Sequence, residues 1–257
     1  MQIDIDFLKS RPLSFSSMKE FDKSPAHYVH YINSKREPSD AMKFGSLVHA
    51  HILEPDTIES RFCFMPDVDR RTTDGKAKWK EAEDNAQGKE TVSFSQWNNA
   101  KSMIDIMKQS DEFNSIISQL KSKEKKFEYE LSGLPFTGYI DGEADDFFLE
   151  VKTIDDASYG NLQRRFADLK YHWQAGLYSM VTGKKCIYLI IQTGSVFDFG
   201  FMTPNQEFIE IGKYGINKAA NNFLTCMIAD GFNIGIDWKV NNENTLSLPG
   251  WLTKVDN

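Results

Sequence analysis

Two short stretches of the sequence combine acidic and basic side chains in an order that could hold a metal ion. Residues 138–143 read GYIDGE and residues 149–153 read LEVKT. Side chains alternate between the two faces of a strand, so Glu150 and Lys152 would share one face. If the preceding strand pairs with this one, Asp141 comes alongside Glu150. Two carboxylates beside a lysine fit a magnesium site in which the lysine orients, or helps to deprotonate, an attacking water.

The same residues could instead form a salt bridge between neighbouring strands on a solvated face. Two features favour a functional site. Gly138 and Gly142 flank Asp141 and leave room for another backbone or a substrate. Glu150 also follows the apolar residues 147–149, which is at odds with a purely solvated strand face.

A histidine stands on the helix predicted over residues 39–54. Gly45 and His49 lie one turn apart at the edge of its apolar stripe, so the glycine leaves space for an ion or a strand beside the imidazole. The alternative is a histidine packed in the core. His51 points roughly 200° away from His49 on the same helix and is interpreted as a packing residue.

Two further groups of residues could support a site or bind a ligand. Gln174 and Tyr178 are four positions apart, so they share one face of a predicted helix and could reach one ligand, or could simply cap a buried helix. A segment that we predict to be a loop is rich in cations and suits phosphates and an unpaired base; the alternative is a mobile charged loop. Its residues are Arg70, Arg71, Lys76, Lys78, Lys80 and the aromatic Trp79.

Taken in order, these motifs resemble the PD-(D/E)XK nucleases. Asp141, followed nine residues later by Glu150-Val151-Lys152, resembles their signature. Residues 44–49 (FGSLVH) resemble the helix of RecB-like nucleases that supplies a metal-binding histidine, and residues 174–178 (QAGLY) are similar to the Gln-x-x-x-Tyr motif of that branch. Residues 13–17 (LSFSS) and 69–79 (DRRTTDGKAKW) look like segments of the exonuclease VIII (RecE-type) nuclease domain.

The resemblance spans nearly the whole chain and implies a role for each matched residue. His49, Asp141 and Glu150 would be ligands of Mg²⁺, with Mn²⁺ as a substitute, and the carbonyl oxygen of Val151 would be a fourth ligand. Lys152 would be the catalytic lysine.

The resemblance also implies that Gln174 and Tyr178 support the site or contact the DNA backbone. Many relatives carry Asp where Glu150 stands, so the reach to the metal is one methylene longer here, and one-ion or two-ion chemistry stays open.

The implied activity is that of a magnesium-dependent exonuclease that degrades duplex DNA from 5′ to 3′ and leaves a 3′ single strand for recombination or annealing. The implied partners are DNA ends, further copies of the chain in a ring, and a single-strand annealing protein. Two alternatives stay open. One is a RecB-like nuclease acting on single strands or flaps, and the other is an inactive DNA-binding or assembly module.

The pattern of elements predicts an α/β (α+β) fold in one domain with three regions. Residues 1–125 are mainly helical, 126–203 form the sheet, and 204–257 form a helix and an irregular tail from residue 238. Strands are predicted from residue 126 and over residues 136–144 and 147–153, as an antiparallel meander with a turn at Asp145-Asp146. One helix over residues 159–181, capped by Gly183, then crosses to strands 186–192 and 196–202.

Composition limits the alternatives. The 257 residues include 30 Lys and Arg against 37 Asp and Glu, a formal net charge of −7, so DNA could bind only at a locally basic surface. The longest apolar stretch, residues 186–191, is far below the ~20 residues of a membrane span, and the acidic N-terminus lacks a secretory signal. We therefore expect a cytoplasmic protein. Three scattered cysteines do not provide the four ligands of an iron–sulfur cluster.

Overall fold

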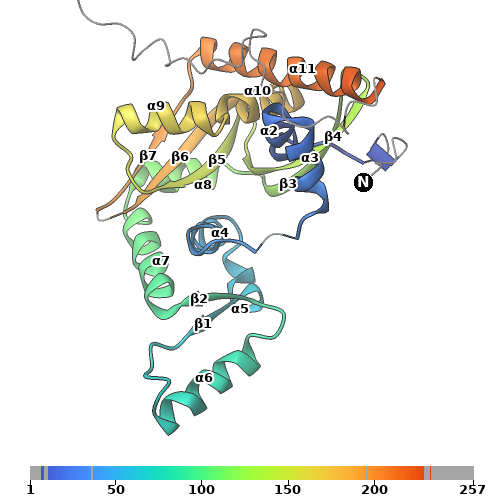
Figure 1. Cartoon of the computed structure of the whole chain (residues 1–257). Helices are drawn as coiled ribbons and strands as arrows, with labels where there is room; N and C mark the ends of the chain where they lie inside the picture. Colours follow the sequence, from blue (N-terminus) through green and yellow to red (C-terminus); the bar gives the residue numbers. More distant parts are fainter. Residues whose placement is uncertain (1–6, 9–10, 36, 195, 229–231, 233–257) are drawn as a thin grey trace, which may run out of the picture.

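A five-stranded mixed sheet forms the centre of the computed structural model, which describes residues 7–8, 11–35, 37–194, 196–228 and 232 (Figure 1). Its strands are β3 Ser122–Leu131, β4 Leu134–Glu143, β5 Phe147–Ile154, β6 Lys185–Thr193 and β7 Phe197–Met202. They lie in the order β3-β4-β5-β6-β7, antiparallel except for the parallel pair β5 and β6. The predicted meander and the mixed sheet flanked by helices are confirmed.

The crossover between the parallel strands consists of two helices, α9 Tyr159–Asp168 and α10 Tyr171–Thr182, so the prediction of one continuous helix is wrong. The helical conformation is interrupted at Lys170, whose φ of 55° lies in the left-handed region. Lys170 forms an ion pair with Asp22 and lies 4.2 Å from the ring centroid of Trp173. Gly183, with φ of 70°, ends α10 as predicted.

The remaining described elements precede or follow the sheet. They are α2 Phe15–Lys23, α3 Pro25–Asn33, α4 Asp40–Leu53, η1 Pro55–Thr57, α5 Ile58–Arg61, β1 Phe62–Met65, α6 Thr73–Asn85, β2 Glu90–Ser93, α7 Phe94–Met107, α8 Asp111–Ser118 and α11 Gln206–Ile228. Not one of the described helices is long and apolar enough to cross a membrane. The tail predicted to be irregular from residue 238 lies outside the described residues.

Capping serines begin several of these helices. Ser39 Oγ accepts a hydrogen bond from the Met42 amide and starts α4 where it was predicted. Helix α2 begins with a capping box formed by Ser14 and Ser17.

The segment predicted to be a basic loop is largely helix α6, because Thr72 Oγ1 accepts a hydrogen bond from Gly75 and caps it. The parallel pair β1 and β2 was not predicted. Figure 1 shows that α6 and this pair form an arm below α4, away from the main sheet.

The sheet is covered on both faces by apolar side chains. One buried cluster joins the sheet to α2, α3, α10 and α11 through residues such as Phe148, Leu177 and Phe223. The other joins it to α4 and α7 through residues such as Val48 and Leu149. Helix α4 is therefore packed against β5, which brings its histidine to the strand that carries the acidic and basic residues.

Helices α10 and α11 cross closely at glycines, and we expect Gly176→Ala to destabilise the fold. A Cβ on Gly176 would lie 2.4 Å from the Lys213 amide nitrogen and 2.5 Å from the Gly212 carbonyl carbon, so the helices would have to separate. The expected loss is about 1–3 kcal/mol in the free energy of unfolding, measured by urea denaturation. Gly160→Ala is the control, because nothing lies within 4 Å of its Cβ. Equal stability of the two variants would contradict the close crossing.

Candidate active site

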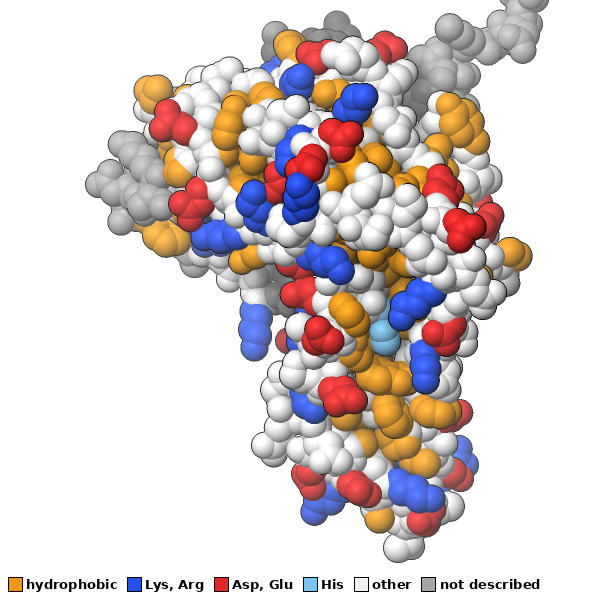
Figure 2. Space-filling view, turned by 180° about the vertical axis from the view of Figure 1, so that it is seen from behind, with side chains coloured by type: hydrophobic (Ala, Val, Ile, Leu, Met, Phe, Trp, Pro, Cys, Tyr) orange, Lys and Arg blue, Asp and Glu red, His pale blue; other side chains and the backbone are white. Residues whose placement is uncertain are grey.

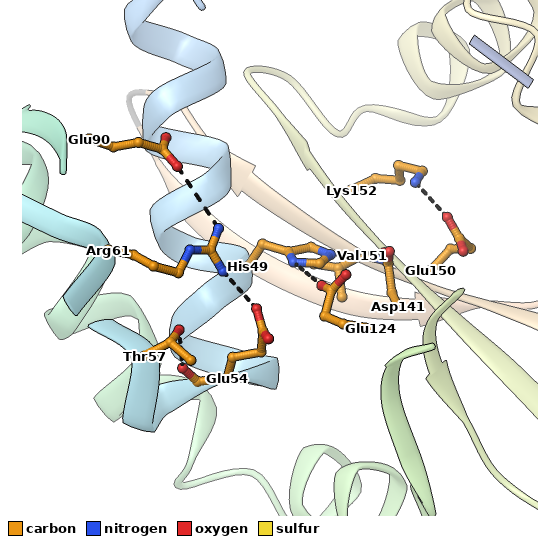
Figure 3. Close-up of polar contacts among 10 residues, drawn as sticks. All are labelled: His49, Glu54, Thr57, Arg61, Glu90, Glu124, Asp141, Glu150, Val151 and Lys152. Carbon is orange, nitrogen blue, oxygen red and sulfur yellow. Dashed lines mark hydrogen bonds and ion pairs between the residues drawn. The ribbon is translucent and has the colours of Figure 1, made fainter. Parts of the chain in front are cut away.

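Four elements bring their polar side chains to one place (Figure 3). Helix α4 supplies His49, β3 supplies Glu124, β4 supplies Asp141, and β5 supplies Glu150 and Lys152. The predicted residues of the two strands and of the helix are therefore neighbours in space, although Asp141 lies 92 positions after His49 in the sequence.

His49 lies between two carboxylates. Its Nδ1 is 2.9 Å from Glu124 Oε1 and its Nε2 is 3.1 Å from Asp141 Oδ2. One ligand atom from each of the three residues lies within 4.8 Å of the others, an arrangement that could hold a metal ion. One nitrogen and two carboxylate oxygens suit a divalent cation such as Mg²⁺ or Mn²⁺.

Glu124 is the member of this cluster that sequence reasoning missed. Its neighbours Lys123 and Lys125 pair with Gly142 and Ile140, which places Glu124 opposite Asp141 on the adjacent strand. Its φ of 48° interrupts the regular strand and turns the residue. The signal was present in the sequence, because a tight turn at residues 132–133 sets the register that brings the two acids together.

Strands β4 and β5 separate at the site. Their ladder includes the pairs Gly142 with Leu149 and Glu143 with Phe148, and Asp141 follows at the end of this ladder. Asp141 Oδ2 accepts a hydrogen bond of 2.7 Å from the Val151 amide. The Asp141 carboxylate thus accepts the hydrogen bond that a backbone carbonyl of β4 would accept in a regular ladder, and this contact holds Asp141 beside β5.

Glu150 is fully buried and does not join the His49 cluster directly. Its Oε2 accepts hydrogen bonds from Lys152 Nζ at 2.8 Å and from Gln174 Nε2 at 2.6 Å. Its Oε1 is buried and has no hydrogen-bond partner among the described residues. The predicted ligand set is therefore divided: His49 and Asp141 are in contact, whereas Glu150 is paired with the predicted catalytic lysine.

The ionisation of the site follows from burial and from these contacts. Burial alone would lower the pKa of His49, but hydrogen bonds to Asp141 and Glu124 outweigh it and raise the pKa to about 10. Burial and the nearby charge of Asp141 raise the pKa of Glu150 to about 8. For Lys152, burial disfavours the ammonium, but the charges of Glu150 and Asp141 outweigh it and hold the pKa above its usual range. Lys152 therefore stays a cation.

The charge of Asp141 is stabilised in the same way. Burial would raise its pKa, but the hydrogen bond with His49 and the charge of Lys152 outweigh burial and lower the pKa below its usual value. An ionised Asp141 is the form that can bind a metal ion.

Gln174 and Tyr178 lie beneath the site and are both buried. Gln174 contacts Glu150 directly, and the Tyr178 ring packs against Phe127 and Phe148 at centroid distances of 5.2 and 6.1 Å. Burial raises the pKa of Tyr178. Of the two roles left open for this pair, its position favours support of the site over contact with DNA.

The other predicted DNA-binding residues lie on the arm. Arg70 stacks over the Trp79 ring at 4.2 Å, and Lys78 pairs with Asp74 at 2.8 Å. Arg71 is almost fully exposed, and Lys76 is also exposed. These residues do not line the cavity at the His49 cluster, so the structure does not bring them together with the site.

A cavity of about 390 Å³ opens onto the His49 cluster. The residues that line it include Ser46 and Arg61 as well as His49, Glu124, Val151, Lys152 and Tyr171. Arg61 pairs with Glu54 at 2.6 Å and lies 3.9 Å from Glu90 (Figure 3). The cavity is therefore lined by His49 and Glu124 of the candidate metal cluster and by the cations Lys152 and Arg61.

His51 lies in a different cavity, with its ring centroid 6.1 Å from that of Trp97. Burial lowers its pKa.

On the face that Figure 2 shows, basic and acidic side chains of the described residues are interspersed. That face does not offer the continuous basic surface that DNA binding would require. The cavity at His49 is therefore the better candidate for the place where a DNA phosphate would bind.

The fold and these residues define a PDDEXK-like protein. Residues 14–230 match the family model "PDDEXK-like domain of unknown function (DUF3799)", and the chain belongs to that family. It is similar in fold to a crystal structure described as a "Putative exonuclease" from Eubacterium rectale, with 14% identity, 99% of both chains covered and a TM-score of 0.58.

Two more distant structures also align. SSO0001 matches with 10% identity, 88% of both chains covered and a TM-score of 0.30. LHK-Exo in complex with dAMP matches with 10% identity, 74% of this chain and 93% of that chain covered, and a TM-score of 0.31. No curated protein matches the sequence.

Proposed function

We propose that this protein is a metal-dependent nuclease that hydrolyses DNA from its ends, in the 5′ to 3′ direction on duplex DNA. One observation carries the proposal: His49, Glu124 and Lys152 line a single cavity, where Asp141 contacts His49 and the buried Glu150 pairs with Lys152. Membership of a PDDEXK-like family and the exonuclease description of a protein with the same fold support it. The duplex substrate, the polarity and the recombination role rest on the motif resemblance.

The residues fit a bound divalent ion. Carboxylate and imidazole ligands converge within 4.8 Å, and the buried Glu150 Oε1 has no hydrogen-bond partner among the described residues, although burial without a partner is costly. His49 would release its proton and, with Glu124 and Asp141, would hold the ion, with Glu150 and the Val151 carbonyl as further ligands. Such an ion supplies Lewis-acid polarisation of the phosphate and lowers the pKa of a water.

Lys152 acts as a cation in this proposal. An ammonium has no free electron pair, so it cannot accept a proton from water. It can donate hydrogen bonds to the attacking water and to a phosphate oxygen, and its charge stabilises the negative charge that develops there. Gln174 holds Glu150 at 2.6 Å and thereby fixes the lysine's partner.

The decisive experiment uses a linear duplex labelled separately at its 5′ and 3′ ends, with Mg²⁺ or with EDTA. We expect Mg²⁺-dependent loss of the 5′ label by the wild type. Cleavage of single strands or flaps alone would move the substrate to the RecB-like alternative. No cleavage of any substrate, together with no Mg²⁺ binding by calorimetry, would favour the inactive DNA-binding module.

Arg61 is the residue that we expect to bind a substrate phosphate beside the site. Arg61→Ala should raise KM for DNA by roughly 10-fold with little change in kcat, because a uniform binding contact is lost. The comparison is Arg71→Ala, which removes an exposed arginine of the arm that the sequence predicts to bind DNA. A larger KM effect at Arg71 than at Arg61 would instead show that the arm grips the DNA.

A further inference from the structure

The Lys152 ammonium has two neighbours that together fix its position. Glu150 Oε2 lies 2.8 Å from Nζ, and the ring centroid of Tyr171 lies 5.1 Å from Nζ. A cation over the face of an aromatic ring within about 6 Å is attracted by the ring's electron distribution. Tyr171 also lines the cavity beside Lys152, so this contact lies at the surface where a substrate would bind.

The Tyr171 ring is itself held by its surroundings. Tyr171 is the first residue of α10, directly after the left-handed Lys170 that separates this helix from α9. The Phe166 ring meets it edge-on with a centroid distance of 5.0 Å, and Tyr188 donates a hydrogen bond of 2.9 Å to the Tyr171 carbonyl. The break in the crossover therefore places an aromatic ring against the lysine.

Tyr188 connects the start of α10 to β5. Tyr188 is buried on β6 and is the Cα partner of Glu150 in the parallel ladder. The strand that carries Glu150 and Lys152 and the helix that carries Tyr171 are thus connected through one hydrogen-bonded tyrosine. The edge-on Phe166 ring and the hydrogen bond from Tyr188 restrict movement of Tyr171 relative to the lysine.

We propose that Tyr171 is a positioning residue that holds the Lys152 ammonium through the face of its ring. This inference rests on the proposed nuclease function and adds a residue to it. An ammonium has three N–H donors, and Glu150 occupies one of them. A ring face attracts the charge without presenting a second carboxylate to it. Donors therefore stay available for the attacking water and a phosphate oxygen.

The main competing role for Tyr171 is a hydrogen bond from its hydroxyl to the DNA. The two roles predict different variants to fail. Positioning through the ring requires only the aromatic face, so Tyr171→Phe should keep kcat within about 2-fold while Tyr171→Leu should lower it roughly 10-fold at unchanged KM. A hydroxyl contact would make both variants fail with a raised KM, and this result would overturn the proposal.

The control is Tyr159→Leu, on the exposed first turn of α9, which should leave kcat and KM unchanged. Duplex digestion with Mg²⁺ is measured for the wild type and each variant. A wild type that cleaves normally, with Tyr171→Leu equal to it in kcat, would overturn the positioning role alone. A wild type that cleaves no DNA would overturn the proposed function. The contact between Tyr171 and Lys152 would then be tested by measuring the free energy of unfolding.

Stability without added metal provides that second measurement. Urea denaturation of the wild type, Tyr171→Leu, Lys152→Met and the double variant forms a double-mutant cycle. We expect non-additive effects, with a coupling of roughly 3- to 10-fold in the ratio of folded to unfolded protein, because each single variant already removes the contact. Additive effects would contradict a direct interaction between the ring and the ammonium.

Discussion

Lys152→Met is expected to reduce the rate of DNA cleavage by roughly 100- to 10,000-fold, the range typical for loss of a positioned proton-transferring or charge-stabilising group. The methionine fills a similar volume but cannot donate hydrogen bonds to water or phosphate. The loss should appear in kcat, measured by single-turnover digestion of the end-labelled duplex in Mg²⁺, while DNA binding changes little.

The fold of this variant must be checked, because removing one partner of a buried ion pair can cost several kcal/mol. Glu150 can limit this cost by taking up a proton, since burial has already raised its pKa to about 8. Lys152→Arg retains the positive charge and provides a second variant that is less prone to unfold. Lys126→Met, at an exposed position of β3, is the control. Wild-type cleavage by folded Lys152→Met would exclude this lysine from the chemistry.

Glu124→Gln is expected to weaken binding of Mg²⁺ or Mn²⁺ by at least about 10- to 100-fold, the cost of losing even an outer-shell partner of a metal site. Glutamine keeps the size of the side chain but removes the negative charge that faces His49 at 2.9 Å. Isothermal titration calorimetry with each metal measures the change directly, without reference to cleavage. We expect the rate of DNA digestion at a fixed low metal concentration to fall in parallel.

The matched control is Glu128→Gln on the same strand, where the carboxylate is exposed and pairs with Lys126. It should leave metal affinity unchanged. Asp141→Asn should be at least as severe as Glu124→Gln, because it also weakens the acceptor of the Val151 amide. If Glu124→Gln binds metal as tightly as the wild type, Glu124 only holds the histidine, and the metal ligands must be sought at Asp141 and Glu150.

Much of the sheet could be predicted because strand signals are local. The alternation of apolar and polar residues in β3 and the nearly continuous apolar run of β6 follow from how each strand is buried, so the five strands were found with small shifts at their ends. The helices were harder. The interruption between α9 and α10 depends on the left-handed conformation of Lys170, which contacts Asp22 and Trp173. The helical pattern of the sequence continues across this position, so nothing in the sequence marks the interruption.

The family resemblance depended on the same kind of local pattern. The motif Glu150-Val151-Lys152, its spacing from Asp141 and the Gly45–His49 step on a helix can all be read along the chain. Membership of the PDDEXK-like family agrees with that reading. The basic residues of the arm do not line the cavity at His49, because clustering in sequence does not fix the distance from a site, and their contact with DNA stays a prediction.

The faces of β4, β5 and α4 that carry Asp141, Lys152 and His49 could be predicted along the chain, since helix and strand periods depend only on the backbone. The tertiary structure decided which of these side chains meet. It packed α4 so that His49 lies beside Glu124, and it placed Gln174 of α10 beside Glu150. Such contacts depend on strand register and on helix packing over long separations, which alternation along one strand does not encode.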